Sequence, residues 1–151
     1  MATEGRRDAR TPPETPAEFG RWPFWRRWFG QRSEREAARY LRKLGYRILA
    51  ANVADTEGEI DLLALDGGTL VVVEVRSRSV EDPSVAAATV NYPKQRRLTE
   101  ATVRFLSRRG MLGATVRFDV LAIAWPPGVR EPTIRHIPHA FEATGRFQFF
   151  S

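Results

Sequence analysis

The sequence of 151 residues contains no cysteine. Disulfide bonds and zinc sites built on thiolates are therefore excluded, and a reducing cytoplasm is the location to expect. No stretch approaches the roughly 20 apolar residues that a membrane-spanning helix needs, and the N-terminus lacks the apolar core of a signal peptide. We therefore expect a soluble, cytoplasmic protein.

The sequence has fewer acidic than basic residues. It contains 18 Asp and Glu and 24 Lys and Arg, which gives a net charge of +6. This balance favours a polyanionic partner, with nucleic acid ahead of anionic lipid. Of the nucleic acids, we expect DNA ahead of RNA. The sequence also lacks a phosphate-binding glycine loop, a G-x-S-x-G motif and a cysteine nucleophile. Charge alone identifies no chemistry, and the oligomeric state stays open.

The first 30 residues differ in composition from the rest. Three prolines lie among small and charged residues before position 20, and "RWPFWRRWFG" at 21–30 then alternates aromatic residues with arginine. We expect residues 1–30 to form a disordered or loosely packed arm, and residues 31–151 to form a single domain. The aromatic segment could stack on bases, lie on a membrane surface or pack on its own domain, and we assign no functional residue there.

Hydrophobic periodicity predicts an α/β domain with elements in the order α-β-β-β-α-β-β. Ser33 and Glu36 fit a capping box at the start of the first helix, which Gly45 ends. Gly110 ends the second helix in the same way. The expected helices span 33–44 and 93–109, and the expected strands span 46–52, 59–65, 69–76, 114–125 and 133–138.

The second and third strands are joined by Gly67 and Gly68, which suit a two-residue hairpin turn. In that register the numbers of opposed residues sum to 135, so Asp61 lies across from Glu74 and Glu59 lies across from Arg76. Opposed carboxylates repel one another unless a cation or a shared proton lies between them. Two readings stay open: a site for a hard divalent cation such as Mg²⁺, and a surface ladder in which Arg76 neutralises both acids.

Four sequence blocks, "GEIDLLA", "LVVVEVRSRS", "KQRRL" and "RFDVLAI", occur in this order. At these separations they closely resemble the YraN-type family of uncharacterised bacterial proteins, which is grouped with the PD-(D/E)XK nucleases. The resemblance covers about residues 30–125. It implies a restriction-endonuclease-like core, in which helices flank a central mixed sheet and a metal site lies at the strand ends.

The resemblance also implies site residues. Asp61 matches the first metal-binding acid, Glu74 matches the acid of the E-x-K element, and the backbone carbonyl of Val75 is a further expected metal ligand. Glu34 matches a helix glutamate that can approach the same metal, and Lys94 matches the block that opens the second helix. The implied cofactor is Mg²⁺ or Mn²⁺.

Arg76 departs from the family pattern, because the E-x-K element has lysine at this position; Ser33 also departs, standing where the family usually has glycine. Lysine can orient or deprotonate water, whereas arginine stays protonated in proteins. Arg76 can hold a phosphate, and Lys94 can supply the amine if it reaches the site. We therefore expect a Mg²⁺-dependent endonuclease-like protein acting on nucleic-acid phosphodiesters, or alternatively a non-catalytic nucleic-acid-binding domain with a degenerate site.

Basic residues on the second helix are candidates for phosphate binding. Arg97, Arg104 and Arg108 fall within about 20° of one another at 100° per residue, and Lys94 and Arg96 lie at the start of the row. The alternative is a solvated helix face.

Asp119 interrupts the fourth strand as Glu74 interrupts the third. It could support the site from the adjacent strand, but we favour a simple ion pair with an arginine.

Overall fold

A computed structural model of the chain describes residues 32–78 and 90–144. The elements are α2 (Arg32–Lys43), β1 (Arg47–Ala54), β2 (Glu59–Asp66), β3 (Thr69–Arg78), α4 (Tyr92–Arg108), β4 (Val116–Ala124) and β5 (Thr133–Phe141). The predicted order α-β-β-β-α-β-β is confirmed. The arm expected at residues 1–30 lies outside the described residues.

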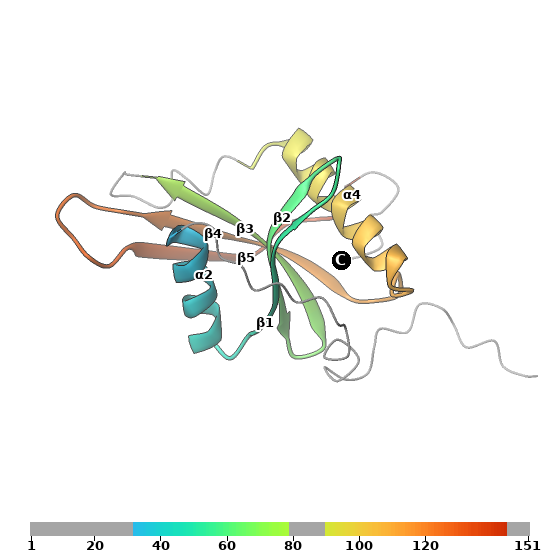
Figure 1. The fold of residues 1–151 in the computed structure, drawn as a ribbon, viewed down its shortest axis with the longest axis horizontal. Helices are drawn as coiled ribbons and strands as arrows, with labels where there is room; N and C mark the ends of the chain where they lie inside the picture. The colour runs from blue at the N-terminus through green and yellow to red at the C-terminus, as the bar shows by residue number, and fades with distance from the viewer. Residues whose placement is uncertain (1–31, 79–89, 145–151) are drawn as a thin grey trace, which may run out of the picture.

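The five strands form one mixed sheet in the order β1-β2-β3-β4-β5 (Figure 1). Neighbouring strands are antiparallel except β3 and β4, which are parallel. Parallel strands need a crossover connection, and α4 lies within it. The expected central mixed sheet with flanking helices is therefore confirmed.

Two hydrophobic clusters bury the two faces of the sheet. On one face, α2 contributes Ala37, Ala38 and Leu41, which pack with Leu62, Val71, Val73 and Leu121. On the other face, α4 contributes Leu98, Ala101, Phe105 and Leu106, which pack with Leu63, Leu65, Leu70 and Val72. Strand alternation sends Leu63 and Leu65 of β2 and the even residues Leu70 and Val72 of β3 toward α4, and Ile60 also packs on this side near the start of β2. In the described ranges, no helix is long and apolar enough to cross a bilayer.

The helix ends follow the glycine signals but not the capping box. Gly45 and Gly110 take positive φ angles of 91° and 66°, and the following N–H groups, from Tyr46 and Met111, bond back to Leu41 and Leu106. The structure corrects the expectation for Ser33, because α2 already begins at Arg32. The Ser33 hydroxyl donates to Ser77 at 2.7 Å and accepts from the indole of Trp125, so it ties α2 to the sheet instead of capping the helix.

The β2–β3 hairpin has the predicted register. Asp66 pairs with Thr69 around Gly67, whose φ of 58° a glycine adopts without strain, and the pairing continues to Leu62 and Val73. The regular ladder ends there, one position before Asp61 and Glu74. The two acids therefore lie where the strands cease to exchange backbone hydrogen bonds.

Candidate functional site

Asp61 occupies the point at which β2 and β3 separate. Its Oδ2 accepts a hydrogen bond from the backbone N–H of Val75 at 2.9 Å, so the carboxylate replaces a ladder partner of β3. This contact fixes the side chain against the strand that carries Glu74. Asp61 therefore lies beside Glu74, as the hairpin register predicts, and is held there by the backbone of the next residue, Val75.

Glu74 is buried, with 4% of its surface exposed. Its Oε1 lies 3.3 Å from Nζ of Lys94 and 3.6 Å from Nε of Arg76. Its Oε2 is buried and has no hydrogen-bond partner in the described part of the chain. A buried carboxylate oxygen without a partner is costly, so a bound cation or a proton shared with Asp61 would stabilise it.

Burial and the neighbouring charge of Glu74 raise the pKa of Asp61 to about 7, against a backbone hydrogen bond from Val75 that lowers it. An aspartic acid normally ionises near pH 4. The pair therefore holds a proton or a cation much more firmly than two separate surface acids would.

The donor set of the pair fits a hard divalent cation. Two carboxylates, one with an unsatisfied oxygen, match the one or two protein carboxylates that Mg²⁺ typically takes beside waters and phosphate oxygens. Within residues 32–78 and 90–144, no three His, Asp or Glu side chains converge on one point, so side chains alone would not fill the coordination sphere. The contact of Val75 with Asp61 is through its N–H, and its carbonyl as a metal ligand stays a prediction.

Glu34 reaches the neighbourhood from α2 but has its own partner. Its Oε2 accepts a hydrogen bond of 3.0 Å from Nδ2 of Asn52, a β1 residue with a left-handed φ of 52°. Burial, followed by the charges of Asp61 and Glu34, raises the pKa of Glu59. Glu59, which the sequence only placed opposite Arg76, is therefore a third acid at this edge of the sheet.

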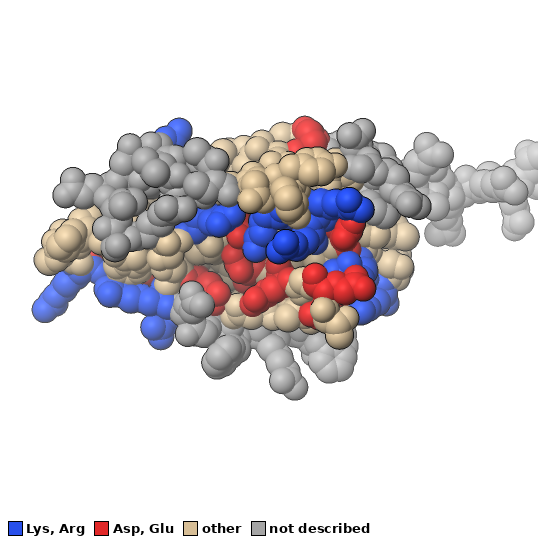
Figure 2. All heavy atoms as spheres, turned by 90° about the horizontal axis from the view of Figure 1, so that it is seen from above, with Lys and Arg blue, Asp and Glu red and all other residues tan. Residues whose placement is uncertain are grey.

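Lys94 reaches the site, and the other predicted phosphate ligands divide into two groups. Arg96 pairs with Glu100 at 3.0 Å, and Arg104 pairs with Asp55 at 2.6 Å and with Glu57 at 3.0 Å. Arg97 and Arg108 are exposed, and neither has a charged partner among the residues that the structure describes. Figure 2 shows basic side chains bordering a patch of acidic side chains on this face of the molecule.

Asp119 lies at the centre of a separate network. It is fully buried, it bonds Arg117 at 2.8 Å and His136 at 2.7 Å, and it accepts the backbone N–H of His139. Burial opposes its ionisation, yet the bonds from His136 and Arg117 outweigh that effect and lower the pKa of Asp119. The expected arginine pair is confirmed, whereas the histidine partner was missed; His136 lies opposite Leu121, two residues along β4 from Asp119, so the pairing of β4 with β5 brings it within reach.

Known proteins resemble this chain over most of its length. The profile of the uncharacterised protein family UPF0102 matches residues 33–123. A UPF0102 protein of Bordetella avium is 42% identical over 122 residues, which cover 78% of this chain and 84% of the relative. A UPF0102 protein of Geobacter sulfurreducens is 44% identical, over 75% of this chain and 88% of the relative. The predicted family, the YraN type, is thus confirmed: this chain belongs to the uncharacterised protein family UPF0102.

Proposed function

We propose that this protein is a cytoplasmic, metal-dependent nuclease of the restriction-endonuclease-like kind, which hydrolyses phosphodiester bonds in nucleic acid, DNA ahead of RNA. The observation that carries the proposal is the Asp61–Glu74 pair. Two acids meet at the end of a strand ladder, one of their oxygens is buried without a partner, and two cationic side chains contact the same carboxylate. A mixed sheet flanked by helices surrounds the pair, which is compatible with the core that the resemblance implies.

The carboxylates of Asp61 and Glu74 would hold one Mg²⁺ or Mn²⁺ ion. Such an ion supplies Lewis-acid activation of water and stabilisation of charge on a phosphoryl group. A buried pair of acids with few other partners suits this role, because a cation offsets both their repulsion and their burial.

Lys94 and Arg76 would have different roles in the reaction. Both place positive charge on Oε1 of Glu74, at 3.3 Å and 3.6 Å, so a phosphate bound beside that carboxylate would meet both. Of the two, only Lys94 has a neutral form that could take up a proton from an attacking water, after its ammonium has first lost a proton to solvent, because a guanidinium does not deprotonate in proteins. The helix α4 would thus supply the lysine that β3 lacks at position 76.

The second candidate is a non-catalytic nucleic-acid-binding domain. It is favoured by Arg76, which stands where a catalytic lysine is expected and which can hold phosphate without acting as a base. In this case Asp61 and Glu74 have no catalytic role, and Arg76 and Lys94 serve only to bind the phosphate backbone of the nucleic acid.

Titration calorimetry with Mn²⁺ tests the proposal, with wild type compared with Asp61→Ala and Glu74→Gln. We expect wild type to bind Mn²⁺ and both variants to lose at least tenfold in affinity. Cleavage of single-stranded, duplex, branched and flapped DNA, and of RNA, is then measured with Mg²⁺ or Mn²⁺. Metal binding without cleavage of any substrate would favour the non-catalytic binding domain. Absence of metal binding even with nucleic acid present would refute the metal-dependent nuclease.

A further inference from the structure

The strand segment that carries Asp61 has little support from the rest of the sheet. The regular pairing of β2 with β3 ends at Leu62 and Val73, before Asp61 is reached. On the other side, the start of β2 pairs with β1, which is itself an edge strand of the sheet. Apart from the bond between Asp61 and the N–H of Val75, this corner of the sheet therefore depends on contacts from outside the sheet.

The helix α4 supplies such a contact through Arg104. Its Nε and one terminal nitrogen bond the two carboxylate oxygens of Asp55, at 2.6 Å and 3.2 Å, and its other terminal nitrogen lies 3.0 Å from Glu57. Asp55 and Glu57 lie in the turn that joins β1 to β2. Only 24% of the Arg104 side chain and 15% of the Asp55 side chain are exposed. A bidentate pair of arginine and carboxylate fixes geometry as well as contributing energy.

Asp55 connects this contact to the backbone of the turn. Its Oδ1 accepts the N–H groups of Glu57 at 2.9 Å and of Gly58 at 3.0 Å, and its own N–H donates to the carbonyl of Gly58. The bond from Arg104, and then the N–H of Glu57, lower the pKa of Asp55 to about 2, so Asp55 stays ionised at neutral pH. Asp61 follows Gly58 by three residues, about 10 Å of extended strand, so the position of the turn constrains the position of that acid.

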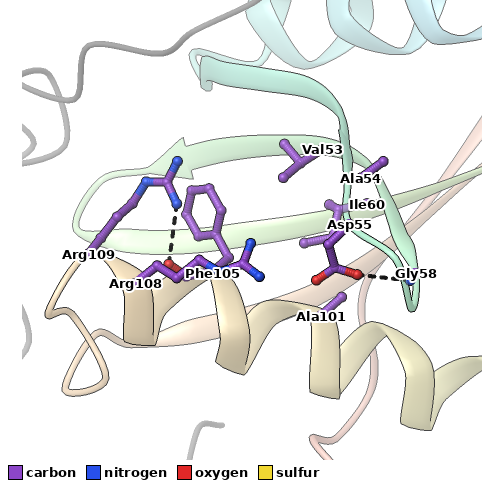
Figure 3. A pocket seen from close by; sticks show the side chains of 9 residues that line it. All are labelled: Val53, Ala54, Asp55, Gly58, Ile60, Ala101, Phe105, Arg108 and Arg109. Atoms are coloured by element: carbon purple, nitrogen blue, oxygen red, sulfur yellow. Dashed lines mark hydrogen bonds between the residues drawn. The ribbon is translucent and has the colours of Figure 1, made fainter.

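Apolar packing between the turn and α4 is incomplete (Figure 3). Gly58 lies against Ala101 of the helix, but a groove of about 170 Å³ lies between the end of β1 and the C-terminal half of α4. Its lining includes Val53 of β1 and Arg108 of α4. The ion pairs of Arg104 therefore attach the turn to the helix where apolar contacts alone leave space.

We propose that Arg104 is a positioning residue of the carboxylate site: by tying the β1–β2 turn to α4, it sets the position of Asp61 relative to Glu74 and Lys94. The inference rests on the proposed function in taking the Asp61–Glu74 pair as the metal site. It assigns a role in that site to a residue that touches neither acid and that the sequence grouped with the phosphate ligands.

The helix α4 would then hold both strands that carry the acids. Lys94 contacts Glu74 of β3, and Arg104, ten residues or about 15 Å further along the helix, holds the turn that precedes β2. The two acids are thus fixed to one helix at the point where their strands cease to pair. Metal affinity depends on residues that orient the ligands without touching the metal.

The test uses the full chain with Arg104→Gln, with Asp55→Asn and with both changes combined. Asp55→Asn keeps an oxygen for the N–H groups of the turn. The matched control is Glu100→Gln, which breaks the exposed pair of Glu100 with Arg96 on the same helix. Calorimetry measures Mn²⁺ affinity, and hydrogen exchange with EDTA present measures protection of the Val75 N–H, which Asp61 accepts.

We expect Arg104→Gln and Asp55→Asn each to weaken Mn²⁺ binding by about tenfold. The double variant should bind no more weakly than either single variant, because all three break the same contact. Protection of the Val75 N–H should fall relative to the β2–β3 ladder amides nearer the hairpin turn, and Glu100→Gln should stay within a few-fold of wild type in both measurements. Arg104→Lys, which keeps the charge but not the bidentate geometry, replaces Arg104→Gln if thermal melting shows that the latter is unfolded.

The sign of the effect separates positioning from charge. Arg104→Gln removes a positive charge and Asp55→Asn removes a negative one, so charge alone would raise Mn²⁺ affinity in the first and lower it in the second. Opposite shifts of this kind, or unchanged protection of Val75, would overturn the proposal. If wild type binds no Mn²⁺, the metal-dependent nuclease fails, and the protection of Val75 alone then decides whether Arg104 positions Asp61.

Discussion

The ammonium group of Lys94 lies 3.3 Å from Oε1 of Glu74, which brings the first turn of α4 against a buried carboxylate of β3. Arg76 approaches the same oxygen from the strand at 3.6 Å. The lysine that the resemblance places on the strand is absent, but a lysine is present in the site. This geometry makes Lys94, rather than Arg76, the residue on which proton transfer would depend.

Lys94→Arg should therefore separate charge from proton transfer. We expect it to lower the rate of cleavage by about 100-fold or more, the usual contribution of a general acid or base, and to leave Mn²⁺ affinity within a few-fold. Single-turnover cleavage and calorimetry measure the two effects. Lys43→Arg, an exposed change on α2, is the matched control. If Arg76→Lys raises the rate strongly while Lys94→Arg has no effect, Lys94 does not have this role.

Stability without metal should fall as pH rises. The pKa of Asp61 is raised from 3.8 to about 7, so the folded state binds this proton more tightly than the unfolded state does. Its contribution is fully present below the unfolded pKa and is lost between about pH 4 and pH 7, a loss of about 4 kcal/mol at roughly 1.4 kcal/mol per pKa unit. Urea unfolding with EDTA present measures this slope.

Asp61→Asn should flatten that slope, because the amide does not titrate and still offers an oxygen to the N–H of Val75. Asp66→Asn, at the other end of β2 and 44% exposed, should leave the slope unchanged. A wild-type protein whose stability rises steadily over this interval would show that the pair does not retain a proton.

Stabilisation by Mn²⁺ should have the opposite pH dependence. Protons and metal compete for Asp61, so affinity should rise by up to tenfold per pH unit until about pH 7 and then level off. Each tenfold gain adds about 1.4 kcal/mol of stability when Mn²⁺ greatly exceeds its Kd. Thermal melting with and without Mn²⁺ measures this difference, and Glu74→Gln should abolish it. A shift that is independent of pH would place the metal elsewhere.

Asp119→Asn should destabilise the fold by about 3 kcal/mol, because it leaves part of a fully buried ionic network uncompensated. Asp66→Asn removes an exposed partner of the same arginine and should cost less than about 1 kcal/mol. Urea unfolding of both variants at neutral pH measures the contrast. Equal losses would mean that burial of Asp119 has no energetic consequence.

Much of the fold follows from local sequence signals. The Gly67–Gly68 turn and the period-2 alternation fix the register of β2 and β3, because adjacent strands joined by a short turn have few alternative pairings. Gly45 and Gly110 end the two helices because few other residues adopt their positive φ angles. These features depend on residues close together in the chain.

Other features depend on contacts between distant segments, and local patterns missed them. Ser33 looked like a helix cap but bonds Ser77 and Trp125, which β3 and β4 bring to α2. Arg104 looked like part of a free basic row, but the β1–β2 turn presents Asp55 and Glu57 to it. His136 reaches Asp119 because β5 pairs with β4 so that His136 lies opposite Leu121, two residues from Asp119.

The sequence by itself determined the order of the elements, the hairpin register and the facing of Asp61 and Glu74, because each follows from turn geometry and strand alternation. Only the tertiary structure decided that Oε2 of Glu74 is buried without a partner, that Lys94 reaches the same carboxylate, and that Arg104 is neutralised while Arg108 and Arg109 line a groove. The physical reason is that burial and ion pairing are set by how α4 packs across the sheet, which no local pattern specifies.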